Sequence, residues 1–305
     1  MKIDILILNY NGKELMGRFL PSIVEASKAS RHECAITVVD NKSADDSRDF
    51  VKNGFPLVHF YAAKENRLLC SYNEVVKELK SDIVIFLNND IKIDRSFIDH
   101  LIEHFKDEKV FFVAPKILNF NGNFNGGRSR LELRHGIIKS VTESDKSDIA
   151  GSTHFISCGA FRRDIFLKLG GFDDLYLPGI WEDVDLCYRA MKQGYKGIYE
   201  PKSIMWHDES TTFKKVYGNR EKMILAHRNM FLFFWKNITD IKMLATHMIM
   251  LIPNIIGAAI KNNTEFVIGF FRALPKLSEA AKKRADPGER DRELRDKDLI
   301  LWRLI

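Results

Sequence analysis

The sequence predicts an α/β fold in which a doubly wound, mainly parallel sheet precedes a C-terminal helical appendage. Short apolar runs alternate with amphipathic helical patterns over the first 114 residues, the order expected of repeated β–α units. The apolar runs are nearly continuous, as in strands that are covered on both faces. After about residue 215 the strand patterns stop and long apolar helical patterns follow.

Five strands and four helices make up the predicted alternation. In chain order, strands are expected at 3–8, 35–39, 57–61, 83–87 and 110–114, and helices at 13–29, from about 44, at 72–79 and at 96–105. Ligands of such sheets bind beyond the carboxyl ends of the strands. Polar residues at those ends are therefore the first candidates for a functional site.

Residues 119–149 differ from the rest of the predicted sheet domain. They are rich in asparagine, glycine and charge, and we interpret them as a long loop with at most short strands. Helices are expected again at 163–169 and 182–193, each closed by glycine. We therefore predict one α/β domain over 1–215 and a helical region over 216–305.

The predicted helical region carries two apolar patterns, 223–235 and 243–260. The second has no charged residue over 18 positions and is interrupted by Pro253 and Gly257, so it barely reaches the length of a membrane span. We expect a helix pair that lies in the membrane interface or packs on the α/β domain. The mixed-charge tail, 276–298, is expected to be a solvated helix or partly disordered.

Composition bounds the classes of protein that fit. The chain is 45% hydrophobic and 29% charged with a net charge of +6, which is ordinary for a folded core. Mild basicity suits an anionic partner such as a nucleotide diphosphate or an acidic lipid surface. A nucleic acid is not expected as a partner, because the sequence has no basic stripe interleaved with aromatic residues and no known nucleic-acid module.

The cysteines bear on the compartment. They are too far apart for a CxxC metal site and each lies among apolar residues, so we expect small buried hydrophobes. The four are Cys34, Cys70, Cys158 and Cys187. Together with an N-terminus that has no signal-peptide pattern, they favour a reduced, cytoplasmic location.

Polar clusters follow three of the predicted strands. Asn9-Tyr10-Asn11-Gly12 follows the first, Asp40-Asn41-Lys42-Ser43 the second and Asn88-Asn89-Asp90 the fourth. If the sheet is parallel, the three clusters meet in space. Asp40 could then accept hydrogen bonds from a nucleobase or ribose, and Asp90 could bind a divalent cation that bridges a diphosphate. The alternative is that each cluster only supplies good turn and cap residues.

Three carboxylates begin one of the later helices. An acidic first turn stabilises the helix dipole, and this explains Asp185, which can also pair with Arg189 four residues on. It explains Glu182 and Asp183 less well, because Trp181 and the preceding glycine indicate a shaped pocket. A carboxylate there could take a proton from an acceptor hydroxyl.

His207 follows another predicted strand, 197–199. A lone histidine is more often structural than a ligand, but a place beyond a strand end favours contact with a metal or with phosphates. The sequence has no GxxxxGK[ST], GxGxxG, HExxH or GxSxG motif. The chemistries that depend on those motifs are therefore not expected.

Taken in order, the motifs resemble those of glycosyltransferase family 2, especially its bacterial rhamnosyltransferase and galactofuranosyltransferase-like branch. The motifs are Asn9-Tyr10-Asn11, Asp40-Asn41-Lys42-Ser43, Asn88-Asn89-Asp90, Gly170-Gly171-Phe172-Asp173, Trp181-Glu182-Asp183-Val184-Asp185-Leu186 and His207. The resemblance spans about 1–236 and includes Arg228-Asn229 in a helix after the catalytic domain. It implies a GT-A fold, with a Rossmann-like nucleotide-diphospho-sugar transferase sheet, and an inverting single displacement that depends on Mg²⁺ or Mn²⁺.

The resemblance also implies roles for individual residues. Asp183 matches the catalytic base and Glu182 beside it would hold the acceptor. Asp40 matches the acid that recognises the nucleotide base, and Asp90 and His207 match the metal site. The remaining donor-binding residues implied are Asn9, Tyr10, Asn11, Asn41, Asn66, Arg67, Asn73, Asn88 and Asn89, and the remaining acceptor-binding residues are Gly159 and Trp181.

The sequence departs from the family pattern in two places. The DxD motif is reduced to Asn88-Asn89-Asp90, so a metal would have fewer protein carboxylates and would depend more on the donor phosphates. The stretch Glu-Asn-x-Gly-small-small appears as Glu65-Asn66-Arg67-Leu68-Leu69-Cys70. Bulkier side chains thus replace the glycine that lets the backbone approach the donor, and Arg67 becomes a candidate phosphate contact.

The predicted function is transfer of rhamnose or a hexose from a dTDP- or UDP-sugar to a hydroxyl of a surface-glycan or polyprenyl-linked acceptor, at the inner face of the cell membrane. Three alternatives stay open: a nucleotidyltransferase, a nucleotide-sugar-binding protein of the same fold with little or no transferase activity, and a membrane-anchored structural module. A nucleotidyltransferase is expected to carry a Gly-rich basic loop after its first strand, where only Gly12 and Lys13 occur here.

Overall fold

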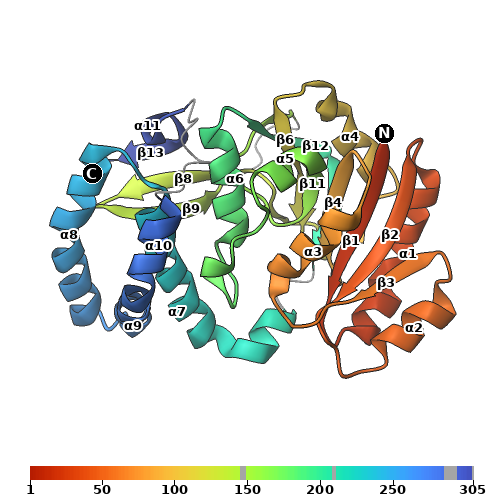
Figure 1. Ribbon diagram of the computed structural model, residues 1–305, viewed down its shortest axis with the longest axis horizontal. Helices are drawn as coiled ribbons and strands as arrows, with labels where there is room; N and C mark the ends of the chain where they lie inside the picture. The colour runs from red at the N-terminus through yellow and green to blue at the C-terminus, as the bar shows by residue number, and fades with distance from the viewer. Residues whose placement is uncertain (145–148, 208–210, 285–293, 304–305) are drawn as a thin grey trace.

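A computed structural model of the chain describes residues 1–144, 149–207, 211–284 and 294–303. Within them lie a ten-stranded mixed sheet, a separate three-stranded sheet and a group of helices at one end of the molecule (Figure 1). The N-terminal elements are β1 (Lys2–Asn9), α1 (Lys13–Ala29), β2 (Glu33–Asp40), α2 (Ser47–Gly54), β3 (Val58–Ala62), η1 (Leu68–Ser71), α3 (Tyr72–Glu78), β4 (Ile83–Asn88), β5 (Ile91–Ile93), α4 (Phe97–Ile102), η2 (Glu103–Lys106) and β6 (Val110–Leu118).

The predicted alternation of strands and helices is confirmed in this half of the chain. Side chains of β1 alternate between the two faces of the sheet, because successive residues of a strand point to opposite sides. Ile5 joins the core under α1 and α4, whereas Leu6 joins the core under α3. Both faces are thus covered, which explains why the strand sequences are nearly continuously apolar.

The strand order brings the predicted polar clusters together. The sheet runs β10-β12-β6-β11-β4-β1-β2-β3, and β1 is parallel to both β2 and β4. Asn9 is in register with Asp40 of β2, and Leu8 is in register with Asn88 of β4. The carboxyl ends of three neighbouring strands therefore meet at one edge.

Residues 119–144 contain more strand than the long loop with at most short strands that we expected. They form β7 (Phe124–Gly126), β8 (Ser129–Arg134) and β9 (Ile137–Thr142), and β8 pairs with β9 as an antiparallel hairpin. His135 and Gly136 connect the two strands with φ values of 48° and 73°, as a two-residue hairpin turn requires. The apolar–polar alternation from Arg130 to Arg134 was the signal for this hairpin.

The second half of the chain completes both sheets. Its elements are β10 (Gly151–Ser152), β11 (Gly159–Arg162), α5 (Arg163–Lys168), η3 (Asp174–Tyr176), α6 (Glu182–Lys192), β12 (Lys196–His207), α7 (Thr211–Asn237), α8 (Ile241–Ile260), α9 (Thr264–Ala273), η4 (Leu274–Lys276), α10 (Leu277–Arg284), α11 (Asp296–Leu299) and β13 (Ile300–Arg303). Strand β11 is antiparallel between β4 and β6, and β13 joins β8. Of the mixed-charge tail, 285–293 lie outside the described residues.

The boundary predicted at residue 215 lies close to a bend in the chain. It falls inside α7, a helix bent at Gly218. Phe231 and Phe233 of this helix belong to the same buried cluster as Phe86 and Phe161 of the sheet. The C-terminal helical region therefore packs on the sheet through a shared buried core.

Candidate active site

One cavity of about 430 Å³ lies at the edge where the polar strand ends meet. The ends of β1, β2 and β4 form one wall, the start of α6 and the end of β12 form others, and α7 contributes a further side. Of the residues proposed from the sequence, those that line it are Asn9, Tyr10, Asn41, Asn66, Asn88, Asn89, Asp90, Trp181, Glu182, Asp183 and His207. The polar strand ends, the acidic start of α6 and His207, which are far apart in the sequence, thus face a single cavity.

A chain of side-chain hydrogen bonds ties the three strand ends together. Asn89 Nδ2 donates to Asn9 Oδ1 over 2.8 Å, and Asn9 Nδ2 donates to Asp40 Oδ1 over 2.8 Å. A Cβ at Gly12 would lie 1.9 Å from Asn89 Nδ2. Gly12 is therefore required by this packing, because any side chain there would displace the asparagine that links β4 to β1.

Asp90 and His207 lie next to each other on the cavity wall. Nε2 of His207 is 3.2 Å from Oδ1 of Asp90, and the Asp90 side chain is 6% exposed. Apart from this contact with His207, the buried Oδ1 has no hydrogen-bond partner among the described residues, so it is available to a ligand. The described residues hold no group of three His, Cys, Asp or Glu side chains suited to a metal. A cation here would thus take one carboxylate and one imidazole from the protein and its other ligands from phosphate and water, an arrangement that suits Mg²⁺ or Mn²⁺.

Glu182 and Asp183 form a coupled acidic pair at the start of α6. Burial, reinforced by the neighbouring Asp183 carboxylate, raises the pKa of Glu182 to about 8. Burial also raises the pKa of Asp183, although the Val184 amide donates to its Oδ1 over 2.8 Å and opposes that rise. Two adjacent carboxylates in one low-dielectric site do not ionise together easily. The pair therefore binds a proton more tightly than an isolated carboxylate does, and burial favours the protonated form of Glu182.

Asp185 has a structural role, as its sequence context suggested. Its carboxylate is fully buried and lies 2.7 Å from Arg189 Nε, the predicted i,i+4 pair, and 2.8 Å from Lys236 Nζ. Burial opposes ionisation of Asp185, but Lys236 and Arg189 outweigh it and lower the pKa of the carboxyl. Asp185 faces away from the cavity and anchors α6 to α7.

Two residues before the acidic pair adopt an unusual backbone. Ile180 and Trp181 have φ values of 73° and 83°, in a left-handed region that costs a non-glycine residue about 1–2 kcal/mol. Trp181 is the N-cap residue of α6. This conformation sets the direction in which α6 starts, and hence where Glu182 and Asp183 point.

Five residues proposed from the sequence do not line the cavity. Asp40 lies behind its wall, where both carboxylate oxygens accept hydrogen bonds from Ser43 and Oδ1 also from Asn9. Asn11 Oδ1 accepts from the Ala44 amide, 2.7 Å away. Direct contact of Asp40 with a nucleotide base would require it to exchange these internal bonds.

The other three have contacts of their own. Arg67 Nη2 lies 3.3 Å from Asp174 Oδ2, so the guanidinium is directed to that carboxylate rather than to the cavity. Asn73 holds the backbone of Phe172 through two hydrogen bonds of 2.8 and 2.9 Å. A Cβ at Gly159 would lie 2.6 Å from the Val113 carbonyl oxygen, which explains this glycine by strand packing.

Leu68 occupies the place of the glycine in the family pattern. Its φ is 49°, so the backbone adopts the left-handed conformation that glycine favours even though the side chain is leucine. Leu68 and Leu69 both line the cavity. The departure in sequence therefore changes the surface of the cavity. The backbone still follows the path that a glycine would allow.

Sequence reasoning missed the part of the cavity formed by other elements. Ser140 of β9 and Phe155 line it, as do Val216, Tyr217 and Lys222 of α7. Among the described lining residues Lys222 is the only lysine or arginine. No local pattern marks these residues, because their place at the cavity depends on the tertiary packing of separate elements.

Comparisons with known proteins identify the family of the chain. The model of the family described as "Glycosyl transferase family 2" matches residues 4–170. The chain is 28% identical over 187 residues to a pre-mycofactocin glycosyltransferase of Mycobacterium tuberculosis, a match that covers 59% of this chain and 38% of that protein. It is 25% identical over 219 residues to the O-antigen chain rhamnosyltransferase RfbN of Salmonella typhimurium, covering 70% of this chain and 68% of that one.

A solved structure shows a similar fold. The crystal structure of GalNAc-T7 with UDP, GalNAc and Mn²⁺ matches with a TM-score of 0.54 at 17% identity, over 75% of this chain and 50% of that chain. The predicted GT-A architecture, a curled, mostly parallel sheet with a helical C-terminal region, is confirmed.

The fold is of the nucleotide-sugar-transferase type, and its polar cavity lies at the strand ends. The family model covers more than half of the chain, and the chain belongs to glycosyltransferase family 2. It spans less than half the length of the mycobacterial relative.

Proposed function

We propose that this protein is an inverting glycosyltransferase that moves rhamnose or a hexose from a dTDP- or UDP-sugar to a hydroxyl of a surface-glycan or polyprenyl-linked acceptor. The observation that carries the proposal is the single cavity shared by Asp90, His207 and Asp183. A transferase of this kind needs a group that binds the leaving diphosphate and a base for the attacking hydroxyl. The similarity to an O-antigen rhamnosyltransferase supports the choice of sugar and acceptor.

In this proposal the donor binds along the strand ends. Asn9, Asn41 and Asn66 line that side of the cavity and offer amide groups to a nucleotide. Asp40 does not contact the donor itself but positions Asn9, by accepting the hydrogen bond from Asn9 Nδ2. Lys222 on α7 adds a positive charge at the cavity that would partly offset the donor diphosphate.

Asp90 and His207 are the residues that would hold a divalent cation. When bound there, Mg²⁺ or Mn²⁺ would neutralise charge that develops on the leaving diphosphate. The Mn²⁺ in the GalNAc-T7 crystal structure supports this choice of ion.

The acceptor hydroxyl is proposed to lie against Glu182 and Asp183. Ionised Asp183 takes the hydroxyl proton as the oxygen attacks the anomeric carbon, and the bond from that carbon to the diphosphate breaks. Protonated Glu182 is available to hydrogen-bond the acceptor, since its Oε2 is buried without a hydrogen bond from the described residues. One displacement on the face opposite the leaving group inverts the configuration.

The pH dependence of kcat/KM should be bell-shaped. Activity is expected to rise as Asp183 ionises and to fall as Glu182 loses its proton near pH 8, because a second carboxylate charge repels the donor and removes a hydrogen-bond donor. In Glu182→Gln the fall near that pH should disappear while the rise on the acid side stays in place. Initial rates across the pH range test this, and an unchanged alkaline limb in the variant would assign it to another group.

We also propose that the protein works at the inner face of the cell membrane and contacts it through α8. This helix is long and apolar enough to span a membrane by length and composition, with a mean hydropathy of 1.8. Its inner face, however, packs on the protein through Met243 and His247. Such a one-sided helix suits the plane of the interface rather than a span.

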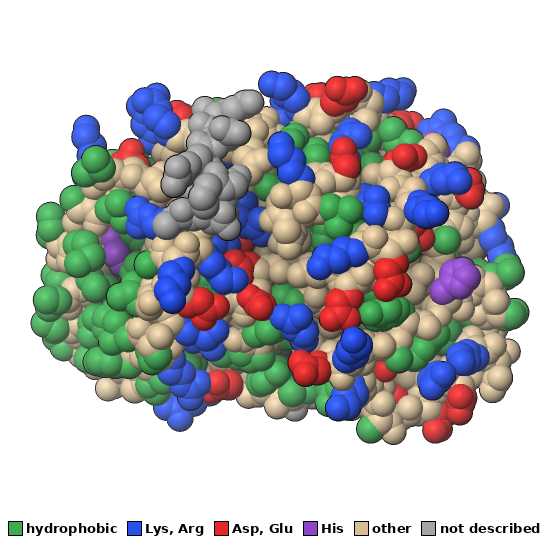
Figure 2. Space-filling view, in the orientation of Figure 1, with side chains coloured by type: hydrophobic (Ala, Val, Ile, Leu, Met, Phe, Trp, Pro, Cys, Tyr) green, Lys and Arg blue, Asp and Glu red, His purple; other side chains and the backbone are tan. Residues whose placement is uncertain are grey.

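The outer face of α8 carries the argument for lipid contact. From 245 to 260 every exposed residue is apolar, namely Ala245, Met248, Ile249, Ile252, Pro253, Ile256, Ala259 and Ile260. Exposed Lys242 and Lys261 stand at the two ends of this stretch, where they could meet anionic headgroups. Figure 2 shows hydrophobic side chains gathered over this end of the molecule.

Placing charges on this face should release the protein from vesicles. Ile249 and Ile252 are 72% and 66% exposed, and burying one isoleucine in an apolar phase contributes about 1.5–3 kcal/mol. The double change Ile249→Asp with Ile252→Asp is therefore expected to lower partitioning onto phosphatidylglycerol-containing vesicles by about 100-fold or more, measured by co-sedimentation.

A matched control is available for this experiment. Leu57 and Ile149 are exposed to a similar extent, 74% and 69%, but lie outside α8. Leu57→Asp with Ile149→Asp should leave partitioning unchanged. Equal binding by the α8 variant and the wild-type protein would contradict the lipid contact.

A further inference from the structure

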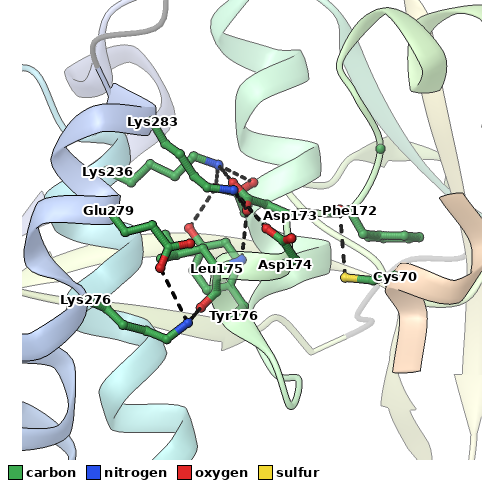
Figure 3. Close-up of polar contacts among 12 residues, drawn as sticks. Cys70, Phe172, Asp173, Asp174, Leu175, Tyr176, Lys236, Lys276, Glu279 and Lys283 are labelled. Atoms are coloured by element: carbon green, nitrogen blue, oxygen red, sulfur yellow. Dashed lines mark hydrogen bonds and ion pairs between the residues drawn. The ribbon is translucent and has the colours of Figure 1, made fainter. Parts of the chain in front are cut away.

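The segment that leads from α5 to α6 is held by the C-terminal helices. Lys236 of α7 and Lys283 of α10 both contact Asp173, with Nζ–O distances of 2.7 and 2.5 Å (Figure 3). Lys283 also lies 2.9 Å from Asp174 Oδ1, and Lys276 of η4 donates to the Leu175 carbonyl over 3.1 Å. Three elements far along the chain thus fix the first half of this segment.

The second half, 176–181, is held by two neighbouring residues of α7, of which Asn229 makes the most contacts. Asn229 of α7 is fully buried, and its Nδ2 lies 2.7 Å from the carbonyl oxygens of Tyr176, Gly179 and Ile180. Arg228 Nε donates to Asn229 Oδ1 over 2.8 Å, which turns the amide so that its NH₂ group faces the three carbonyls. Arg228 Nη2 also donates to the Tyr176 and Leu177 carbonyls, over 3.1 and 2.6 Å.

The carbonyls converge on Asn229 because of the local backbone. Ile180 and Trp181 are both left-handed, which closes the chain into a tight turn immediately before Glu182. Buried carbonyl groups need donors, and three of them share the two N–H groups of the Asn229 amide. The unusual backbone and the amide that contacts it therefore stabilise each other.

We propose that Asn229, oriented by Arg228, is a positioning residue for sugar transfer: it fixes the turn at 176–181 so that Glu182 and Asp183 face the cavity. This inference rests on the proposed function. Asn229 does not line the cavity and acts only through the turn. Helix α7 thereby contributes to sugar transfer by positioning the acidic pair.

Asn229→Asp tests the proposal, because it keeps the shape of the side chain but replaces the donating NH₂ with an oxygen. We expect kcat to fall about 100-fold, the loss typical of a small displacement of reacting groups, with the Kd for the nucleotide donor within about threefold of wild type. Asn219→Asp is the matched control, since Asn219 lies on the same helix and is exposed. The control should keep wild-type kcat.

Amide hydrogen exchange over 176–184 gives a readout that does not need activity. Exchange there should quicken in Asn229→Asp and stay unchanged in Asn219→Asp. A folded Asn229→Asp with wild-type kcat, or with wild-type exchange in this segment, would overturn the proposal. If wild-type protein transfers no sugar from any donor, the proposed function fails, while exchange still decides whether Asn229 holds the turn.

A second variant covers the case in which Asn229→Asp does not fold. Arg228→Lys keeps the positive charge but loses the Nε bond that orients Asn229. It is expected to lower kcat about tenfold at unchanged donor Kd and to quicken exchange over 176–184. Wild-type kcat and exchange in folded Arg228→Lys would contradict the inference in the same way.

Discussion

Replacing Asp183 with asparagine is expected to lower kcat for sugar transfer by about 10²–10⁴-fold, the contribution typical of a positioned general base. The amide cannot take the acceptor proton, but it keeps the size of the side chain and the oxygen that accepts from the Val184 amide. Donor affinity should change little, because Asp183 acts on the acceptor. Single-turnover rates with a nucleotide-sugar donor, and calorimetry for donor binding, measure the two effects separately.

Asp164→Asn is the matched control for this change. Asp164 also starts a helix and its Oδ1 also accepts from the following backbone amide, over 2.7 Å, but it is exposed and lies outside the cavity. It should retain wild-type turnover. Wild-type turnover in Asp183→Asn as well would remove Asp183 as the base.

Replacing Asp90 with asparagine should have the second large effect, on binding rather than on proton transfer. The change removes the carboxylate charge next to His207, which a cation bridging a diphosphate would use. Affinity for Mn²⁺ in the presence of UDP is expected to fall by about 100-fold or more, and kcat/KM should fall with it. Calorimetric titration of Mn²⁺ into protein with UDP measures the affinity directly.

Asp94→Asn provides the comparison for Asp90. Asp94 follows β5, four residues along the chain, and its Oδ1 already accepts from the Ser96 backbone and hydroxyl, over 2.9 and 2.6 Å. It should bind Mn²⁺ and UDP as wild type does. If wild type and Asp90→Asn bind UDP equally well and without any effect of metal, Asp90 does not hold a cation.

Much of the fold could be predicted because its strands are buried on both faces. Such strands are read directly from apolar runs, as for β1 and β4, and amphipathic α1 follows from its helical period. The hairpin of β8 and β9 was missed because its asparagine- and glycine-rich surroundings look like a loop. Strand β13 could not be foreseen, since it completes a sheet more than 150 residues away in the chain.

The site could be predicted where its residues come from strand ends and helix starts. Topology alone brings Asn9, Asn41 and Asp90 to one edge, and this follows from the order of β–α units. Asp40 and Arg67 differ from the prediction because Ser43 and Asp174, which lie close to them in space, hold their side chains away from the cavity. Such competition between internal partners and a ligand is not visible in a sequence.

The contribution of α7 was only partly predicted, because the resemblance included Arg228-Asn229 without giving either residue a role in the site. Lys222 at the cavity and Asn229 behind it depend on how this helix crosses the fold, which no local pattern specifies.

The configuration of the transferred sugar tests the account most directly. Wild-type protein would be incubated with Mn²⁺, an acceptor and a panel of dTDP- and UDP-sugars, and the anomeric configuration of the product determined by NMR. With Asp183 as the base of a single displacement, the product must have the opposite anomeric configuration to the donor. A product with the donor's configuration, formed by folded protein in this assay, would contradict the proposed roles of Asp183 and Glu182.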